Sequence, residues 1–176
     1  MRLHSTDLPG VVRIEPERLS DERGFFARTY CREELAAAGL DPEIAQCSLS
    51  FNPTKGTLRG MHYQAEPHGE TKLIRCTMGS IYDVLVDLRP QSPAFKRYAA
   101  FTLTAETREL LYVPPGIAHG FITLTPDCEV FYQISVPYHA ESARGVRWDD
   151  PAFGIEWPAE PTLISDRDRD YPDFED

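Results

Sequence analysis

Two histidines and a lysine of this chain have the residue types and surroundings expected of a proton-transfer site. His62 lies in the run 59–64 (Arg-Gly-Met-His-Tyr-Gln), His119 lies in the run 114–121 (Pro-Pro-Gly-Ile-Ala-His-Gly-Phe), and Lys72 follows the first histidine by ten residues. A neutral imidazole accepts or returns a proton near pH 7, and an ammonium stabilises a developing oxyanion. Both runs are apolar and strand-like, so we expect an acid/base site inside a β-barrel.

Gln64 argues against a metal at this site. A barrel that held a metal beside His62 would need a second histidine close to it, and position 64 has an amide instead. An amide is a poor replacement for imidazole as a transition-metal ligand. The sequence therefore predicts no catalytic metal and no cofactor.

Composition and charge exclude several classes of protein. The 176 residues are 41% hydrophobic and 26% charged, which fits one globular domain over residues 1–176. A net charge of −10 argues against nucleic acid as a general partner. The chain has no apolar run of about 18 residues and no signal-like start, so we expect a cytoplasmic protein without a membrane partner. Cys31, Cys47, Cys76 and Cys128 form no CxxC pair, so we expect reduced, mostly buried thiols.

The hydrophobic pattern predicts an all-β fold with one short helix. Residues 32–38 combine strong helix formers with acidic residues in the first turn, and Gly39 ends the helix. From Leu58 onward the period is two and turn residues recur about every 8–12 positions, which is typical of antiparallel strands in a sandwich or barrel. So many short strands need an architecture that protects the edges of their sheets, and a jelly roll does this. The expected strands are Lys72 to Thr77, Ile81 to Leu88, Tyr98 to Leu103, Glu109 to Val113, Phe121 to Leu124 and Glu129 to Val136.

The two ends of the chain differ from this pattern. Gly10 to Ile14 reads as a strand that precedes the barrel and pairs with another subunit, so we expect a homodimer. The tail after Trp157 is rich in Pro and Asp, and we expect it to be a surface loop.

Longer motifs give a specific resemblance. They occupy residues 57–64, 83–89, 92–93, 115–121, 148–151, 154–158 and 165–168. In this number and order they resemble the dTDP-4-dehydrorhamnose 3,5-epimerase family, which are nucleotide-sugar epimerases of the cupin superfamily. The resemblance covers nearly the whole chain. It implies a cupin-type antiparallel jelly-roll barrel with a short N-terminal helix and a peripheral C-terminal segment.

The activity that the resemblance implies is an isomerase of deoxysugar biosynthesis, as in the rhamnose pathway. Such an enzyme inverts C3, C5 or both in a nucleoside-diphosphate 4-keto-6-deoxyhexose through an enolate. By motif match His62 is the base, Asp168 holds its other ring nitrogen, Lys72 stabilises the enolate oxygen, and Tyr132 donates a proton on the far face.

The same resemblance bears on the metal. Metal-binding cupins use two His and a Glu from a first motif and a His from a second. Here Gln64 replaces one histidine and Lys72 falls where the Glu would stand. An ammonium repels a divalent cation, so the resemblance too predicts a metal-independent enzyme.

A substrate-binding set is also implied. It comprises Arg23, Phe26, Arg28, Gln46, Arg59, His119 and Tyr138. We expect Arg23 to contact a phosphate and Phe26 to lie against the base or sugar. Arg59 or His119 is expected to assist Lys72 at the enolate oxygen. The family usually has Glu where this chain has Arg28, and Asn where it has Ser48. A guanidinium donates hydrogen bonds and cannot accept one from the N–H of thymine. Two alternatives follow. Either the base is one with acceptors, such as cytosine or guanine, or Arg28 turns outward to a second phosphate or an acidic neighbour.

Other interpretations stay open. A lone histidine on an apolar strand is more often a core residue, and a lone strand tyrosine is ordinarily packing. Asp166 or Asp170 could take the place of Asp168, and Asp83 either orients His119 or points to solvent. The alternative functions are a 3-epimerase, an epimerase of CDP- or GDP-linked sugars, a related ketoisomerase, a metal-dependent cupin isomerase or oxygenase, and a non-catalytic sugar-binding cupin.

Overall fold

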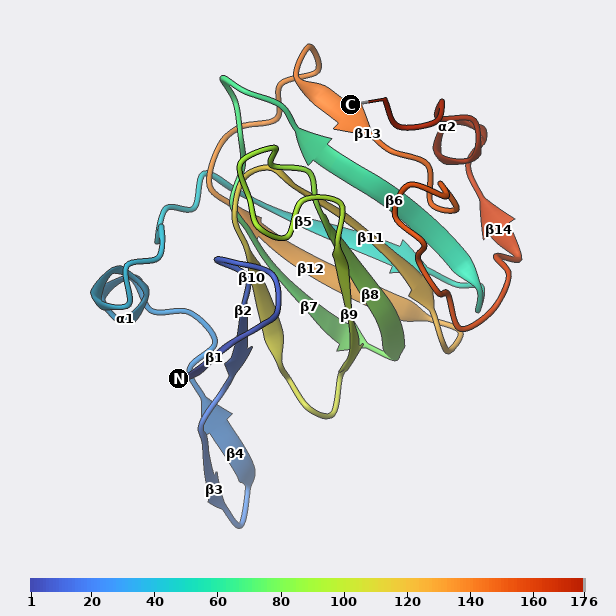
Figure 1. The fold of residues 1–176 in the computed structure, drawn as a ribbon. Coiled ribbons are helices and arrows are strands. Elements are labelled where there is room, and N and C mark those ends of the chain that lie inside the picture. Colours follow the sequence, from blue (N-terminus) through green and yellow to red (C-terminus); the bar gives the residue numbers. More distant parts are fainter. Residues whose placement is uncertain (176) are drawn as a thin grey trace.

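Two antiparallel sheets face each other in the computed structural model, which describes residues 1–175 (Figure 1). The first sheet has the order β1 (Arg2–Ser5), β2 (Val12–Glu15), β10 (Leu110–Val113), β7 (Lys72–Met78), β12 (Cys128–Ile134) and β5 (Gln46–Asn52). The second has the order β13 (Ala143–Gly145), β6 (Thr57–Gln64), β11 (Ile117–Thr123), β8 (Ser80–Asp87) and β9 (Tyr98–Thr104), with β14 (Leu163–Ile164) parallel to β6. This is the predicted all-β, jelly-roll type of fold.

Four further elements lie outside the two sheets. The strands β3 (Arg18–Asp21) and β4 (Gly24–Ala27) form a hairpin that stands away from both sheets in Figure 1. The helix α1 (Arg32–Ala37) follows this hairpin, and α2 (Asp166–Arg169) lies near the C-terminus beside β6 and β14. Neither helix has the length and apolar character needed to cross a membrane.

Strand alternation in β8 explains how the layers pack. Ile81 and Leu85 enter the core between the sheets, while Val84 and Val86 lie on the outer face of the second sheet. That outer face is covered by the segment around Phe153 and by the C-terminal residues. The helix α1 covers the outer face of the first sheet with its buried leucine. The second sheet and the part of the first sheet under α1 are therefore covered on both faces, whereas the edge strand β5 stays exposed.

The predicted elements agree closely with the observed ones. Five of the six expected strands end within two residues of β7, β8, β9, β10 and β12, and the helix ends one residue earlier than expected. The strand expected at Phe121 begins four residues sooner, at Ile117, because the stretch with His119 and Gly120 pairs with β8 without interruption. The thiol prediction was right for Cys76 and Cys128, which are buried, but Cys47 is exposed.

Both chain ends need correction. The strand expected at Gly10 to Ile14 is β2, and its two edges are already paired with β1 and β10 of the same chain. It therefore has no edge left for another subunit. The tail after Trp157 was predicted as loop only, and this was wrong because it contains β14 and α2, which pack on β6.

Two glycines bring β6 and β11 unusually close. A Cβ added at Gly120 would lie 2.9 Å from the carbonyl oxygen of Arg59, and one at Gly60, whose φ is +132°, would lie 2.5 Å from the Gly120 Cα. The ladder shifts register between His119 and Phe121, so that His119 lies directly opposite His62. The spacing of the two histidines thus depends on glycine at these positions.

We predict that Gly120→Ala lowers the free energy of unfolding by about 1–3 kcal/mol, because the added methyl meets backbone atoms that cannot move aside. Urea unfolding measures this effect. Gly69→Ala is the matched control, since its methyl meets only side-chain atoms, Glu66 at 2.7 Å and Pro115 at 3.1 Å, and we expect a smaller change of about 0.5 kcal/mol. Equal stability of the two variants would contradict the packing argument.

Candidate active site

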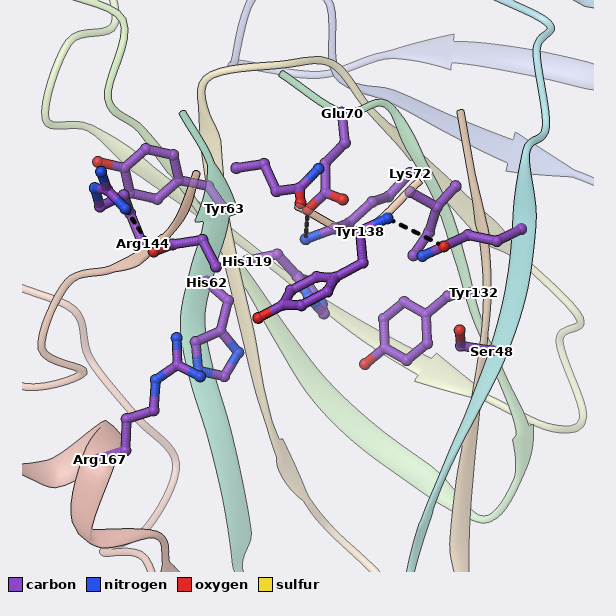
Figure 2. Close-up of a pocket in the computed structure, with 14 residues that line it drawn as sticks. Ser48, His62, Tyr63, Glu70, Lys72, His119, Tyr132, Tyr138, Arg144 and Arg167 are labelled. Carbon is purple, nitrogen blue, oxygen red and sulfur yellow. Dashed lines mark hydrogen bonds and ion pairs between the residues drawn. The ribbon is translucent and has the colours of Figure 1, made fainter. Parts of the chain in front are cut away.

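A cavity of about 250 Å³ lies between the two sheets (Figure 2). Strands of both sheets line it, β5, β7 and β12 from the first and β6 and β11 from the second. Its lining residues are Gln46, Ser48, His62, Tyr63, Gln64, Glu70, Lys72, His119, Tyr132, Ile134, Tyr138, Ala143, Arg144 and Arg167. Most residues predicted for the catalytic site therefore meet in one place.

His62 on β6 is held by Asp168 on α2. Its Nε2 lies 2.7 Å from Asp168 Oδ1, and the Gly60 amide donates to Asp168 Oδ2 at 3.1 Å. Burial alone raises the pKa of Asp168, but the hydrogen bond and charge of His62, together with the Gly60 amide, outweigh it and hold the pKa below its usual range. Because the carboxylate can only accept, Nε2 carries the hydrogen and Nδ1 keeps the lone pair that can take a proton.

The short helix α2 selects Asp168 among three acidic residues. Ser165 caps the helix by accepting from the Asp168 amide at 3.2 Å, which turns this one carboxylate inward. Asp168 is 4% exposed, whereas Asp166 and Asp170 are exposed and pair with Arg169. The geometry therefore favours Asp168 over both alternatives.

His119 makes a second histidine–carboxylate pair, deeper in the barrel. Its Nε2 lies 2.7 Å from Asp83 Oδ2, and both side chains are buried. Asp83 thus faces inward, and the alternative that it points to solvent is wrong. Burial raises the pKa of Asp83, while the charges of His119 and Lys72 oppose that rise. The Nδ1 of His119 is the ring nitrogen left for a molecule in the cavity.

Lys72 and Tyr132 line the same cavity. The Lys72 ammonium is 2.8 Å from the carboxylate of Glu70, which leaves its other two N–H groups for a ligand. Burial, and then the negative charge of Asp83, raise the pKa of Tyr132, so its hydroxyl keeps its proton at neutral pH. The Tyr132 ring meets the His119 ring edge-on with centroids 5.9 Å apart.

His62 and Tyr132 belong to different sheets. His62 lies on β6 of the second sheet and Tyr132 on β12 of the first, and both border the cavity between them (Figure 2). A flat molecule in the cavity would have an imidazole on one side and a phenol on the other. With Lys72 beside them, these groups can remove a proton next to a carbonyl, hold the enolate and return a proton to the opposite face.

Two predicted substrate-binding residues form the rim of the cavity. Gln46 on β5 accepts through Oε1 from the Tyr138 amide at 3.3 Å, and the Tyr138 ring, 61% exposed, lies over the opening. Glu70 and Arg167 are among the lining residues that were not predicted. Arg167 directly precedes Asp168 and lies beside His62, a position that only the fold of α2 reveals.

Four predicted substrate-binding residues do not line this cavity. Arg59 is exposed, and its Nε donates to Asn52 at 2.7 Å. Arg23, Phe26 and Arg28 lie on or beside the β3–β4 hairpin, away from the sheets.

Arg28 has an acidic partner in the structure, whereas the sequence left the partner of this side chain open. Its guanidinium donates to Glu34 at 2.7 Å, and this ion pair sits on the surface. An acidic neighbour was one of the two alternatives for this side chain.

The donor set inside the barrel does not fit a divalent metal. The buried amide of Gln64 donates through Nε2 to the His68 carbonyl at 3.0 Å and accepts through Oε1 from the His139 amide at 2.6 Å. The ammonium of Lys72 lines the same cavity, and its charge repels a divalent cation. Two histidines alone are too few ligands for a structural or catalytic site.

Comparisons with known proteins agree with this geometry. The family model described as dTDP-4-dehydrorhamnose 3,5-epimerase matches residues 5–176. A dTDP-4-dehydrorhamnose 3,5-epimerase of Shigella flexneri is 39% identical over 177 residues, which cover 100% of this chain and 97% of the relative.

Solved structures give the same result. A dTDP-4-dehydrorhamnose 3,5-epimerase of Bacillus anthracis, with TDP and PPi bound, superposes with a TM-score of 0.94 at 38% identity and covers 98% of this chain and 99% of its own. ChmJ, a 3'-monoepimerase of Streptomyces bikiniensis in complex with dTDP-quinovose, has a TM-score of 0.89 at 34% identity and covers 97% and 86%. The full-length matches and the paired site together show that this chain belongs to the dTDP-4-dehydrorhamnose 3,5-epimerase family.

Proposed function

We propose that this nucleotide-sugar epimerase inverts both C3 and C5 of a TDP-linked 4-keto-6-deoxyhexose, without a metal or other cofactor. The observation that carries the proposal is the placement of His62 and Tyr132 on opposite walls of one cavity. His62 Nδ1 removes the proton from the carbon next to the ketone, and Tyr132 returns one to the other face. Lys72 stabilises the enolate oxygen between these steps. Inversion at C3 alone is the second candidate, because ChmJ is named as a 3'-monoepimerase.

The hairpin residues fit a homodimer. Leu19, Phe25 and Phe26 are exposed on the β3–β4 hairpin, and Leu49 and Phe51 are exposed on the edge strand β5. A second copy would cover these apolar side chains and pair the free edge. In such a dimer the hairpin of one copy would bring the nucleotide-binding candidates to the cavity of the other. We propose this arrangement, with residues 1–176 as one domain working in the cytoplasm.

The role of His62 is tested by deuterium uptake in D₂O. We expect the enzyme to place deuterium from solvent at C3 and C5 of the sugar, and His62→Ala to slow this uptake by about 10²–10⁴-fold, because the base is gone. NMR of the product reports both positions. Deuterium at C3 alone would favour the second candidate.

Two controls separate this effect from a general loss of structure. His4→Ala removes a surface histidine, which lies 3.2 Å from Glu15, and should leave the rate unchanged. Asp168→Asn should slow uptake at least about tenfold, because the amide no longer fixes the tautomer, whereas Asp166→Asn on the same helix should not. Uptake at the normal rate in His62→Ala would disprove the assignment of the base.

Tyr132→Phe separates proton removal from inversion. We expect inversion to fall about 10²–10³-fold, because the donor on the far face is missing, while deuterium uptake falls less. Stereochemistry and isotope content of the same sample are read by NMR. Tyr82→Phe is the matched control, since its hydroxyl bonds to the Glu156 carbonyl on the outer face of the sheet. A parallel loss of uptake and inversion would show that Tyr132 does not act as the separate acid.

The nucleotide that the enzyme prefers tests whether Arg28 contacts the base. Among TDP-, CDP- and GDP-linked 4-keto-6-deoxyhexoses, we expect the TDP sugar to have the highest kcat/KM by about tenfold or more. Arg28→Ala should keep this order, because Glu34 already holds the guanidinium. A preference for the CDP or GDP sugar that disappears in Arg28→Ala would mean that Arg28 reads the base.

A further inference from the structure

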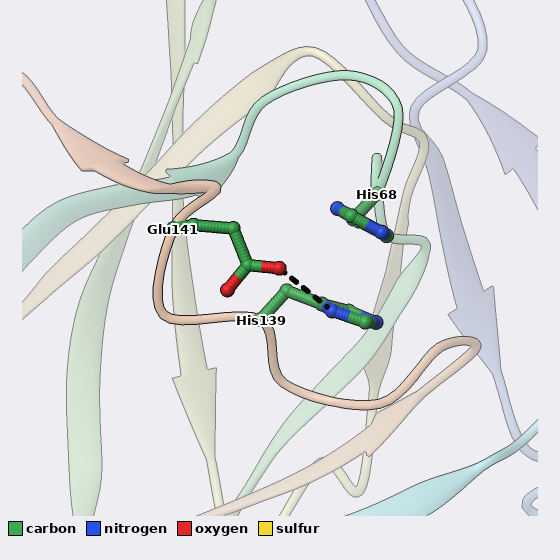
Figure 3. Close-up of side chains that lie close together, drawn as sticks. All are labelled: His68, His139 and Glu141. Carbon is green, nitrogen blue, oxygen red and sulfur yellow. Dashed lines mark hydrogen bonds and ion pairs between the residues drawn. The ribbon is translucent and has the colours of Figure 1, made fainter.

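Two histidines and a glutamate that take no part in the barrel chemistry meet outside it (Figure 3). The rings of His68 and His139 stack with centroids 3.6 Å apart and planes 12° from parallel, and Glu141 Oε1 lies 3.3 Å from His139 Nδ1. One potential ligand atom from each of the three residues lies within 4.8 Å of the others. Among residues 1–175 this is the one such group of three, and it includes neither His62 nor His119.

The backbones that carry these side chains are fixed. His68 lies in the loop between β6 and β7, and His139 and Glu141 lie in the loop between β12 and β13. The buried amide of Gln64 bonds both loops, at the His68 carbonyl and the His139 amide, and the Ala65 amide adds a bond to the Ser142 carbonyl at 2.8 Å. Only side-chain rotation is then needed to bring the three groups to a common point.

A hydrogen bond to Ser142 orients the His68 ring. His68 Nδ1 lies 2.9 Å from the hydroxyl of buried Ser142, which leaves Nε2 outward, and metal-binding histidines commonly hold such a partner on their second nitrogen.

We propose that His68, His139 and Glu141 form a site for Zn²⁺ at the rim of the catalytic cavity. Two imidazoles and one carboxylate suit Zn²⁺ better than Ca²⁺ or Mg²⁺, which prefer oxygen ligands. Bond lengths of about 2.0–2.2 Å require the ligand atoms to close by roughly 1 Å from their present spread, and a water takes the fourth position.

A bound ion would join two loops that border the cavity. Glu70, the partner of Lys72, follows His68 on one loop, and Tyr138, which lies over the opening, precedes His139 on the other. Zn²⁺ would therefore restrain the rim while taking no part in proton transfer. This inference does not depend on the proposed substrate.

Titration of the untagged full-length protein with Zn²⁺, followed by calorimetry, tests the site. We expect one ion per chain and a loss of affinity of about 10–100-fold in His68→Ala and in His139→Ala. Co²⁺ as a second probe should give the visible absorption of a four-coordinate ion in the normal protein only. Circular dichroism confirms that each variant is folded, and Glu141→Gln serves as a third variant with unchanged shape.

Two histidine variants serve as controls. His4→Ala removes a histidine that has a carboxylate partner but no second histidine, and His62→Asn removes the catalytic candidate. Both should bind Zn²⁺ as the normal protein does. The absence of binding, undiminished binding in His139→Ala, or loss of binding in His62→Asn would each overturn the proposal.

Discussion

The contact between His62 and Asp168 is the interaction on which the rest of the site depends. It joins residues 106 positions apart, at 2.7 Å, and it needs the C-terminal helix to return to β6. The carboxylate accepts a hydrogen on Nε2 and so leaves the lone pair on Nδ1, the atom that we propose as the base. The C-terminal segment thus positions the proposed base and also covers the outer face of the second sheet. An isolated histidine on β6 would have no fixed tautomer.

The two-sheet architecture suits a reaction that inverts a carbon centre. A base and an acid on one wall would return a proton to the face from which it came. Here β6 and β12 carry the proposed base and acid on opposite walls, and the close approach of Gly60 and Gly120 sets His119 directly across from His62. In the proposed mechanism the ammonium of Lys72 supplies positive charge to the enolate. The Gln64 side chain hydrogen-bonds both rim loops.

Much of this could be predicted from the sequence, and the failures have physical reasons. Strand alternation and turn spacing predicted the antiparallel fold, because both reflect local burial. Motif resemblance placed His62, Lys72, Tyr132 and Asp168 in one site, and all four meet at or beside the cavity. Local patterns could not show that Glu70 pairs with Lys72, since Glu70 lies in the loop before β7, where side chains follow no period.

Where the sequence misled, a longer-range feature of the fold decided the outcome. The Pro- and Asp-rich tail forms α2 only because Ser165 caps it and β6 receives it. Both edges of β2 are paired within the chain, one with β1 and one with β10, and the sequence pattern did not reveal this. The hairpin that carries Arg23 and Phe26 stands away from the cavity of its own chain, a separation that no linear motif encodes.

A crystal structure of the enzyme with a TDP-linked 4-keto sugar, or a stable analogue of it, is the most direct test of the central claim. The account predicts a sugar ring held between the sheets, with His62 Nδ1 near the reacting carbon on one face and the Tyr132 hydroxyl on the other. A sugar that meets both side chains on the same face, or a His62 ring that ligates a metal, would contradict it.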